Sequence, residues 1–489
     1  MENKSHNTQD VRAAMADMMA SKEVFRQAVS YSFEYMDGVS DRPVFPEQKA
    51  LDGLAAFDEP LPETPGDPKQ ILSLLHEKGS PATTAQTGGR YFGFVIGGTI
   101  PAALAARWLS DVWDQNAVLH VASPITAKLE EVCEGWLVDL LGLPQGTASG
   151  FVTGTSVATF CGLAAGRNAL LEGAGWDAAT KGLFGAPPLR VIMGEEAHAT
   201  VFKALSLLGL GSENVEKVPV DGQGRMDPAR MPELDERCLL ILQAGNVNSG
   251  AFDSFAEICP KAREAGAWIH IDGAFGLWAA GSKRFQNLTQ GVDLADSWSL
   301  DAHKTLNIPY DCGIVLCRRR EALAAAMQAS GSYIIYGEER DNMLYTPDMS
   351  RRGRGPELWA ALKFLGKEGV GQLVDGLCDN AALLAEMLRE RGFRILNDVA
   401  FNQVLAACET DELTQKTLAA VQASGECWCG GAVWKETQAI RVSVCSWVTT
   451  RDDLERTANA FFQALNNAKM ATKTNAKRTL LKTISTKMN

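Results

Sequence analysis

The clearest pattern in the chain is a series of short apolar runs between residues 190 and 317. The runs are RVIMG, CLLILQAG, AWIHID, ADSWSL and GIVLC, and helical stretches separate them. Continuous runs rich in Val, Ile and Leu are typical of strands buried on both faces, so they predict an α/β fold with a mainly parallel sheet covered by helices. Ligands of such sheets bind at the carboxyl ends of the strands.

The segments on either side of this region have different patterns. Before about Gly89, helical runs such as VRAAMADMMASKEVFRQAVSYSFEYM precede a Pro-rich connection, which indicates a helical arm. PAALAARWLSDVWDQN and PITAKLEEVCEGWLVDLLGL then carry apolar residues three and four positions apart, as in amphipathic helices. From about Glu357, a long helix, strands near RILNDV and FNQVLAA, another helix and a strand at AIRVSVCSW predict a smaller α/β region.

These patterns divide the 489 residues into four expected parts, since a chain of this length exceeds one ordinary core. We expect an N-terminal helical arm over 1–89 and a large ligand-binding domain over 90–356. A small C-terminal α/β domain is expected over 357–467, and a basic flexible tail over 468–489.

The charge of the chain bears on its partners. A formal net charge of −12 argues against nucleic acid, because phosphate binding requires a basic surface. The tail from Ala468 to Asn489 has six basic residues and no acidic one. Such a tail can contact an anionic membrane surface, but its Thr and Asn content is more typical of a solvated, frayed end. We expect no stable membrane association.

Cysteine usage and the N-terminus indicate the compartment. The 11 cysteines have no framework spacing, and Cys427 and Cys429 lack a second pair that would complete a zinc site. The first residues, MENKSHNTQD, are polar, and no segment has the uncharged length of a membrane span. We therefore expect reduced thiols, no metal and a cytoplasmic protein.

Two polar residues follow predicted buried strands and suggest chemistry. Lys304 in SWSLDAHKTLNIPYDCG can become a nucleophile towards an aldehyde if partial burial beside a cation lowers its pKa. Asp272 in AWIHIDGAFGLWAA can hold a protonated ring nitrogen. Taken singly, Lys304 is more often an ordinary loop lysine, and Asp272 has the alternative of a helix N-cap. The 32 residues between them allow one helix and one strand, so both can reach one crevice.

Two further segments fit the same crevice. GFVTGTSVATFCGLAAGRNALL contains a glycine turn that opens a helix, where free N–H groups and the hydroxyls of Thr155 and Ser156 suit a phosphate. A plain capping sequence has the same form. His198 in MGEEAHATVFKALSLLG follows another strand, and its flat ring can stack on a flat cofactor, although a structural histidine is the alternative.

With these four elements in this order, the chain resembles the group II pyridoxal-phosphate decarboxylases, the family of the aromatic-amino-acid, glutamate and histidine decarboxylases. The resemblance runs from about Gly89 to Thr450, and HID-G-A and DAHK are its most specific parts. It implies the fold type I, aspartate-aminotransferase-like architecture, a homodimer clasped by the N-terminal arm, and pyridoxal 5′-phosphate bound by the large domain.

The resemblance also implies a role for each matching residue. Lys304 would hold the cofactor as a Schiff base, Asp272 would bind its pyridine nitrogen, and His198 would stack on the ring. The remaining implied cofactor contacts come from the residue beneath the ring, the phosphate turn, the neighbour of the lysine and the loop after the third run: Ala274, Thr155, Ser156, His303 and Asn246. The chain departs from the family at Val157, Asn246 and Thr305, where Glu, Thr and Trp are usual, which puts transfer of the substrate in doubt.

The resemblance implies decarboxylation of an L-amino acid to an amine and carbon dioxide. The Gly-rich stretch QASGSYIIYGEERDNMLYTPDMSRRGRG is typical of a flexible active-site loop. In the family a loop tyrosine protonates Cα, and Tyr333 is the matching position, with Tyr336 and Tyr345 as other tyrosines of the loop. Transamination, aldehyde-forming oxidative deamination and carbon–carbon lysis on the same fold are the alternatives, and an aminotransferase would use Arg441 for the α-carboxylate.

The substrate side is marked by two weaker features. Tyr91, Phe92 and Phe94 in RYFGFV resemble the aromatic segment that lines the family's substrate pocket, and they also fit a plug between helices. Arg351, Arg352 and Arg354 can hold an acidic substrate or pair with carboxylates of the protein, and we favour the pairing.

Overall fold

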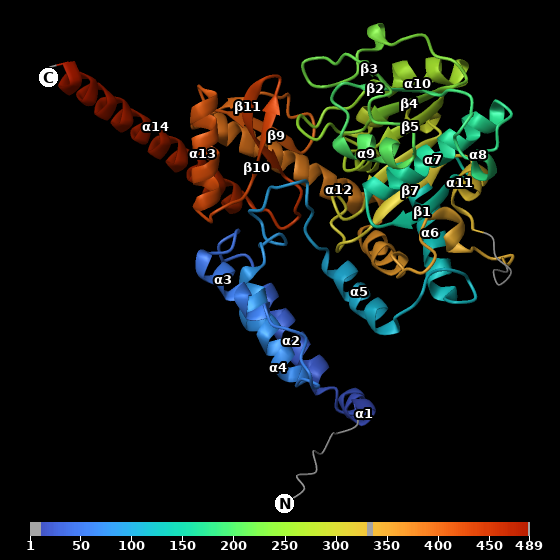
Figure 1. Ribbon diagram of the computed structural model, residues 1–489, viewed down its shortest axis with the longest axis horizontal. Coiled ribbons are helices and arrows are strands. Elements are labelled where there is room, and N and C mark those ends of the chain that lie inside the picture. The colour runs from blue at the N-terminus through green and yellow to red at the C-terminus, as the bar shows by residue number, and fades with distance from the viewer. Residues whose placement is uncertain (1–10, 330–335, 488–489) are drawn as a thin grey trace, which may run out of the picture.

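A seven-stranded sheet lies at the centre of the computed structural model, which describes residues 11–329 and 336–487 (Figure 1). The strand order is β1-β7-β6-β5-β4-β2-β3, and β7 is antiparallel to both of its neighbours. The strands are β1 Ala148–Val152, β2 Arg190–Gly194, β3 Val215–Val218, β4 Cys238–Gln243, β5 Trp268–Asp272, β6 Ser297–Asp301 and β7 Gly313–Cys317. The α/β class with a mainly parallel sheet is therefore confirmed.

Helices cover both faces of this sheet. One face packs against α7 (Thr155–Gly173), α9 (Ala199–Leu207) and α11 (Arg320–Met327). The other packs against α6 (Pro124–Leu141), α10 (Phe255–Glu264) and α12 (Gly355–Glu390). Two further helices are α5 (Pro101–Trp113), which packs on α12, and α8 (Ala178–Lys181). With both faces covered, the strands read as the continuous apolar runs seen in the sequence.

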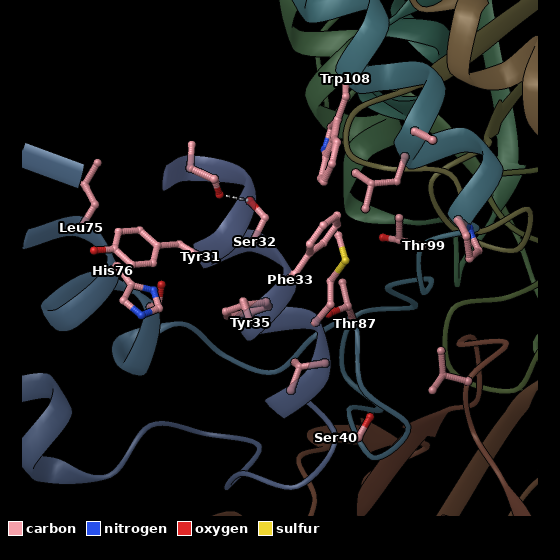
Figure 2. A pocket seen from close by; sticks show the side chains of 18 of the residues that line it. Tyr31, Ser32, Phe33, Tyr35, Ser40, Leu75, His76, Thr87, Thr99 and Trp108 are labelled. Carbon is pink, nitrogen blue, oxygen red and sulfur yellow. Dashed lines mark hydrogen bonds between the residues drawn. The ribbon is translucent and has the colours of Figure 1, made fainter. Parts of the chain in front are cut away.

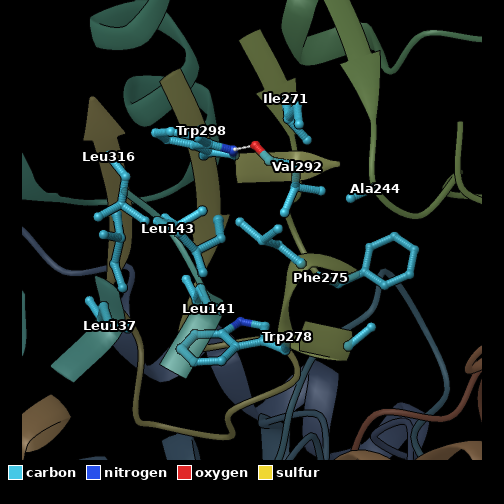
Figure 3. Close-up of a cluster of buried hydrophobic side chains, with 14 of the residues drawn as sticks. Leu137, Leu141, Leu143, Ala244, Ile271, Phe275, Trp278, Val292, Trp298 and Leu316 are labelled. Carbon is cyan, nitrogen blue, oxygen red and sulfur yellow. Dashed lines mark hydrogen bonds between the residues drawn. The ribbon is translucent and has the colours of Figure 1, made fainter. Parts of the chain in front are cut away.

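The larger core lies between the sheet and the face formed by α6, α10 and α12 (Figure 3). Two fully buried tryptophans satisfy their indole N–H groups within it, as buried indoles usually do. Trp298 donates to the carbonyl of Val292 (2.9 Å), and Trp278 donates to the carbonyl of Asp301 (3.0 Å). The second bond fixes the backbone of the last residue of β6.

A smaller antiparallel sheet follows in the chain, with strand order β10-β11-β9-β8. Its strands are β8 Arg394–Ile395, β9 Gln403–Ala407, β10 Gly430–Trp434 and β11 Thr437–Ser443. The second half of α12, α13 (Asp411–Ala423) and α14 (Arg451–Lys487) pack with it around a separate apolar core. α12 is interrupted at Gly366, where φ is 59°, a conformation that favours glycine.

The C-terminal stretch differs from the frayed tail expected from residue 468. In the structure α14 continues as a helix to Lys487 and projects away from the small sheet (Figure 1). The stretch contains Ala, Lys, Leu and Met and neither Gly nor Pro, so its helix propensity is sufficient to extend the preceding helix.

The first helices form an arm beside the main body (Figure 1). They are α1 Val11–Ser21, α2 Glu23–Gly38, α3 Gln48–Asp52 and α4 Pro68–Leu74. Large apolar side chains of α2 are exposed, among them Phe25 and Phe33 at 49% and 53%. Across the described part of the chain, every helix is too short or too polar to span a membrane.

Candidate active site

A cavity of about 470 Å³ lies at the carboxyl ends of the parallel strands. Because β7 is antiparallel to β1 and to β6, β1 runs in the same direction as β2, β4, β5 and β6. The segments that follow all five strands therefore meet at one edge of the sheet. They bring Thr155, His198, Gly245, Asp272 and Lys304 to the lining of this one cavity.

Lys304 is held by an ion pair with Asp301, the last residue of β6. The lysine Nζ lies 3.0 Å from Oδ2 of the aspartate, and the two side chains are 19% and 3% exposed. Burial opposes the ionisation of Asp301, but the charges of Lys304 and His303 and a hydrogen bond from Thr155 outweigh it and lower the pKa of the carboxyl. The pair fixes the lysine amine at the cavity wall.

Asp301 also binds the start of α7. The N–H of Thr155 donates to its Oδ1 at 2.7 Å. The two segments approach closely because Gly313 of β7 has no side chain: a Cβ there would lie 2.3 Å from the Cα of Gly154. One carboxylate thus joins the lysine to the helix start that was expected to bind phosphate.

Asp272 ends β5 and is buried at 5% exposure. Burial raises the pKa of its carboxyl, and the charges of His198 and Lys304 act in the opposite direction. Its Oδ1 accepts the N–H of Ala274 at 3.2 Å, and Ala274 lines the cavity. A cation placed against Asp272 would stabilise its ionised form.

Two imidazoles line the cavity. His198 caps α9 and accepts the N–H of Thr200 at Nδ1 (3.3 Å), while burial lowers its pKa. His303 accepts the N–H of Cys312 at Nδ1 (3.0 Å), and burial lowers its pKa too. The ring of Tyr310 stacks on His303 with centroids 4.1 Å apart. Burial thus favours the neutral form of both histidines, and the rings of both line the site.

The start of α7 offers unsatisfied donors. Its N-cap is Gly154, which provides no side-chain cap, and the Thr155 hydroxyl is buried with no hydrogen-bond partner among the described residues. Ser156 is exposed and also lines the cavity. A helix N-terminus with a free buried hydroxyl is suited to bind an anionic oxygen.

Asn307 holds the lysine turn against two other loops. Its amide nitrogen donates to the carbonyls of Lys304 and Cys445 (3.1 and 2.9 Å). Its oxygen accepts the N–H groups of Gly98 and Trp447 (2.7 and 2.9 Å). The side chain is fully buried and its φ is 56°, a conformation that asparagine tolerates better than most residues.

The aromatic residues of RYFGFV lie in two different places in the structure. Phe94 lines the cavity, as expected for the substrate pocket, with 60% of its surface exposed. Tyr91 and Phe92 lie outside the cavity. Tyr91 is buried under Trp428, with rings stacked at 5.3 Å, and Phe92 packs in the core of the small sheet. The difference arises because the hydrogen bond of the Phe92 N–H to the Trp428 carbonyl draws this part of the segment into that sheet.

Asn246 was expected to contact the cofactor, but it lies behind the cavity wall. Its Oδ1 accepts the N–H of Asn248 at 2.9 Å and its amide nitrogen donates to the carbonyl of Glu196. The side chain is 1% exposed, whereas its neighbours Gly245 and Val247 line the cavity. Asn246 thus closes its own turn, which is the local bonding that asparagine favours.

The three arginines after the loop pair with carboxylates, as favoured from the sequence. Arg351 forms a two-pronged pair with Glu130 (2.8 Å for each bond), and Arg354 pairs with Asp311 (2.9 Å). Arg352 also pairs with Asp311 (2.8 Å). These pairs are largely buried rather than on the surface, so the three arginines brace the loop. None of them lines the cavity, and the arginine that does so comes from another element.

That cation is Arg441 of β11. It lines the cavity, and its guanidinium makes no ion pair or side-chain hydrogen bond within the described residues. Burial lowers its pKa. The small sheet thus contributes one free cation to the site of the large sheet.

Of the three tyrosines at 333, 336 and 345, two lie in the part of the chain that the structure describes. Tyr333 lies outside the described residues. Tyr336 donates to the carbonyl of Ala329 at 2.6 Å, and Tyr345 is 7% exposed and accepts a hydrogen bond from Arg320. Tyr345 therefore belongs to the packing between α11 and the loop.

Sequence reasoning missed Asp301, Asn307 and Tyr310 as site residues. Asp301 had a signal, since it stands three residues before Lys304 at the end of the same apolar run. Asn307 and Tyr310 had no such signal. Asn307 bonds to Cys445, which is 138 residues downstream, and Tyr310 belongs to the site through its stacking on His303.

The site can be compared with known proteins. A family model described as the pyridoxal-dependent decarboxylase conserved domain matches residues 52–406. The chain is 26% identical to an aromatic-L-amino-acid decarboxylase of Bacillus atrophaeus over 379 residues, 74% of this chain and 75% of that one. It is 27% identical to the acidic amino acid decarboxylase GADL1 of Bos taurus over 330 residues, 64% and 62% of the two chains. A crystal structure of Oryza sativa TDC with PLP and tryptamine superposes with a TM-score of 0.85 at 21% identity, covering 92% of this chain and 98% of that one.

Proposed function

Because the chain belongs to the pyridoxal-dependent decarboxylases, and is thus a carboxy-lyase that uses pyridoxal 5′-phosphate and an amino acid, we propose a role for each residue of its cavity. Lys304 binds the cofactor covalently, Asp272 pairs with its ring nitrogen, and Tyr333 delivers the proton to Cα. The observation that carries the proposal is that Asp301-bound Lys304 and buried Asp272 share one cavity.

The residues present fit the cofactor chemically. Asp272 is a buried carboxylate that a protonated ring nitrogen would stabilise, because burial alone raises its pKa. Thr155 has a buried hydroxyl with no partner in the described chain, at a helix start suited to a phosphate. Ala274 lines the cavity and is small enough to leave room for a flat ring, and the imidazole of His198 belongs to the same lining. These three features correspond to the ring nitrogen, the phosphate and the ring faces.

When bound, the cofactor supplies an electron sink for the charge left at Cα after carbon dioxide departs. The protein must then orient the substrate and move protons. Asp301 keeps the Lys304 amine at the wall, and Asn307 fixes the turn that carries it. Tyr333, which follows α11 in the sequence, donates a proton to Cα in our proposal.

The test is a panel of L-amino acids incubated with purified enzyme and added cofactor, with carbon dioxide, amine, aldehyde and keto acid measured together. We expect one amino acid to give equal amounts of carbon dioxide and amine. An aldehyde in place of the amine, or a keto acid without carbon dioxide, would contradict the reaction assignment.

The role of Tyr333 is tested with Tyr333→Phe. Removing a general acid typically lowers the rate by about a hundredfold to ten-thousandfold, so amine formation should fall by that factor. Tyr336→Phe is the matched control on the same loop, and its rate should stay near that of the parent. Equal effects of the two changes would reject Tyr333 as the donor.

A second candidate reaction, transamination, is favoured by Arg441. An arginine that pairs with the α-carboxylate stabilises it as a carboxylate and so opposes its loss as carbon dioxide, and Arg441 lines the cavity without an ion pair to any described residue. In that case the keto acid should form and should disappear in Arg441→Gln. The amino acid panel distinguishes this outcome from decarboxylation.

We also propose that two copies of the chain associate through the helical arm. A groove of about 890 Å³ lies between α2 and α5, lined by apolar side chains including Phe33 and Trp108 (Figure 2). Exposed apolar residues of this extent usually mark an interface. Analytical ultracentrifugation should give a dimer, and Phe33→Asp with Met36→Lys should give a monomer. A monomeric parent enzyme would contradict the proposal.

A cytoplasmic location is the remaining part of the proposal. It is supported by the 11 cysteines, all of them free and buried. Reduced thiols of this kind are typical of a reducing compartment. Fractionation of the source cells, followed by activity measurement, tests the location.

A further inference from the structure

A second polar cavity lies at the opposite edge of the large sheet. Its volume is about 500 Å³, and its lining includes Trp268, the first residue of β5, and Asp296, just before β6. Four residue steps of β5 separate Trp268 from Asp272 in the active site. At about 3.3 Å per residue, the two ends are roughly 13 Å apart.

Four arginines line this cavity, which we call the arginine cavity. They are Arg237, Arg263, Arg318 and Arg319. In the described part of the chain, none of the four forms an ion pair with a carboxylate, although the protein has a net charge of −12. Unpaired guanidinium groups gathered in one hollow repel one another, so an anion bound among them would be stabilised.

Backbone carbonyls hold two of these arginines in place. Arg318 Nε donates to the carbonyl of Ala295 at 3.1 Å, and a second nitrogen donates to that of Asp293. Arg263 donates to the carbonyl of Leu294 at 3.1 Å. The turn 293–295 therefore orients both guanidinium groups. Since each guanidinium has five N–H donors, several remain for a ligand.

The two carboxylates of the lining do not neutralise this charge. Asp296 accepts the N–H of Ile269 (2.9 Å); burial raises the pKa of its carboxyl, and this hydrogen bond and the charges of Arg263, Arg318 and Arg319 act in the opposite direction. Glu236 is exposed. Four cations against two carboxylates leave a net charge of +2 even with both carboxylates ionised, which a phosphate dianion would balance. Guanidinium forks bind phosphate oxygens in pairs.

The part of the lining that carries no charge is small or apolar. The guanidinium of Arg319 lies over the Trp268 ring, 4.9 Å from its centroid. The carboxyl end of α7 provides a wall of small or apolar residues: Ala169, Leu170, Gly173 and Ala174. One or two phosphate groups would not fill 500 Å³, and the wall offers a surface to an organic group.

We propose that the arginine cavity binds a nucleotide, with its phosphates among Arg263 and Arg318 and its flat base against the wall of α7. The site is separate from the active site and does not depend on which reaction the enzyme catalyses.

Calorimetric titration of the holoenzyme, freed of excess cofactor, tests the proposal. The probes are ADP, pyrophosphate and adenosine, in low salt without phosphate buffer. We expect ADP to bind at micromolar concentrations, pyrophosphate to bind about tenfold more weakly, and adenosine not to bind. ADP binding that is absent below 1 mM would overturn the proposal. Pyrophosphate binding as tightly as ADP would overturn the role of the base.

Variants locate the site. Arg263→Gln with Arg318→Gln should weaken ADP binding about a hundredfold, since a hydrogen bond to a charged group typically changes affinity by about tenfold or more. Arg237→Gln with Arg319→Gln is the second pair, because these exposed side chains make no hydrogen bond that the fold requires. Arg230→Gln with Arg389→Gln is the charge-matched control on exposed arginines elsewhere.

The control pair should leave ADP affinity within about twofold of the parent. Equal weakening in the control pair, or unchanged affinity in both cavity pairs, would overturn the proposal. Thr155→Ala separates the site from the cofactor's phosphate position: ADP affinity should be unchanged, and its loss would place the nucleotide in the active site instead.

Discussion

The two ends of the central strands handle charge in opposite ways. At the carboxyl ends, the Lys304 cation is matched by Asp301 at 3.0 Å, and Asp301 also accepts the N–H of Thr155. At the amino ends, Arg263 and Arg318 donate hydrogen bonds to backbone carbonyls and form no ion pair within 4 Å in the part of the chain that the structure describes. The active site is thus organised by contacts within the chain. The arginine cavity has four arginines against two carboxylates in its lining, so it keeps positive charge that an anion from outside can balance.

The same contrast separates two aspartates on adjacent strands. Asp272 and Asp301 both end buried strands, yet the pKa of Asp272 is raised by burial while that of Asp301 is lowered by the charges of Lys304 and His303, against burial. The ion pair with Lys304 therefore decides the direction in which the pKa of Asp301 shifts. Asp272 is the one left to pair with a further cation, which is the role proposed for it towards the cofactor.

The largest effect is expected from removing the cation at the carboxyl end. Lys304→Ala should abolish carbon dioxide release and the visible absorption band of the bound cofactor, because Lys304 is the one lysine among the described residues that line the cavity. Absorption spectra after addition of cofactor and gel filtration measure the second effect. Retention of the band with Lys304→Ala would show that a different lysine binds the cofactor.

Breaking the ion pair from its other side should have the next largest effect. Asp301→Asn in the cofactor-free protein should lower the free energy of unfolding by about 3 kcal/mol, since it leaves a largely buried cation unpaired. Urea unfolding measures this change. Asp301→Asn combined with Lys304→Met should recover most of the loss, because the double change removes both charges. Additive losses in the double variant would mean that the two residues do not interact.

A smaller effect is expected at Asn307, which positions the lysine turn without touching the substrate. Asn307→Ala should lower kcat about tenfold with little change in KM, since unsatisfied buried groups would let the turn move. It should also shift the pH at which the cofactor band titrates. Asn307→Asp keeps the acceptor for Gly98 and Trp447 and should restore part of kcat. A change in KM alone would instead indicate a substrate contact.

The sequence predicted the strands of the large sheet because buried parallel strands have a distinctive pattern. It also located Lys304, Asp272 and His198 at strand ends, and the structure brings all three to one cavity. β1, β3 and β10 were missed, since ASGFV and GGAVW contain glycines that weaken the pattern and VEKV is a short edge strand with two charged residues.

Contacts across long sequence distances could not be predicted. Phe92 is drawn away from the cavity by Trp428, and Asn307 binds Cys445, so both positions depend on how the small sheet docks on the large one. No local sequence pattern predicts how the two sheets pack. The arginines of the arginine cavity are likewise far apart in the sequence, since they precede β4, lie at the end of α10 and follow β7.

The last prediction concerns His270, which lies on β5 between the two ends. Both ring nitrogens face serine hydroxyls, Ser297 at 2.8 Å and Ser299 at 3.3 Å, and burial lowers the pKa to about 3 from 6.5. The unfolded chain therefore takes up a proton below pH 6.5 that the folded chain does not, so stability is lost as pH falls from 6.5 towards 3. The loss is about 1.4 kcal/mol per pH unit, or about 2 kcal/mol between pH 7 and 5. Urea unfolding gives the free energy of unfolding at pH 7 and at pH 5. The difference between the two values should be smaller by about 2 kcal/mol in His270→Gln than in the parent. An unchanged difference would assign the acid sensitivity to the strand ends.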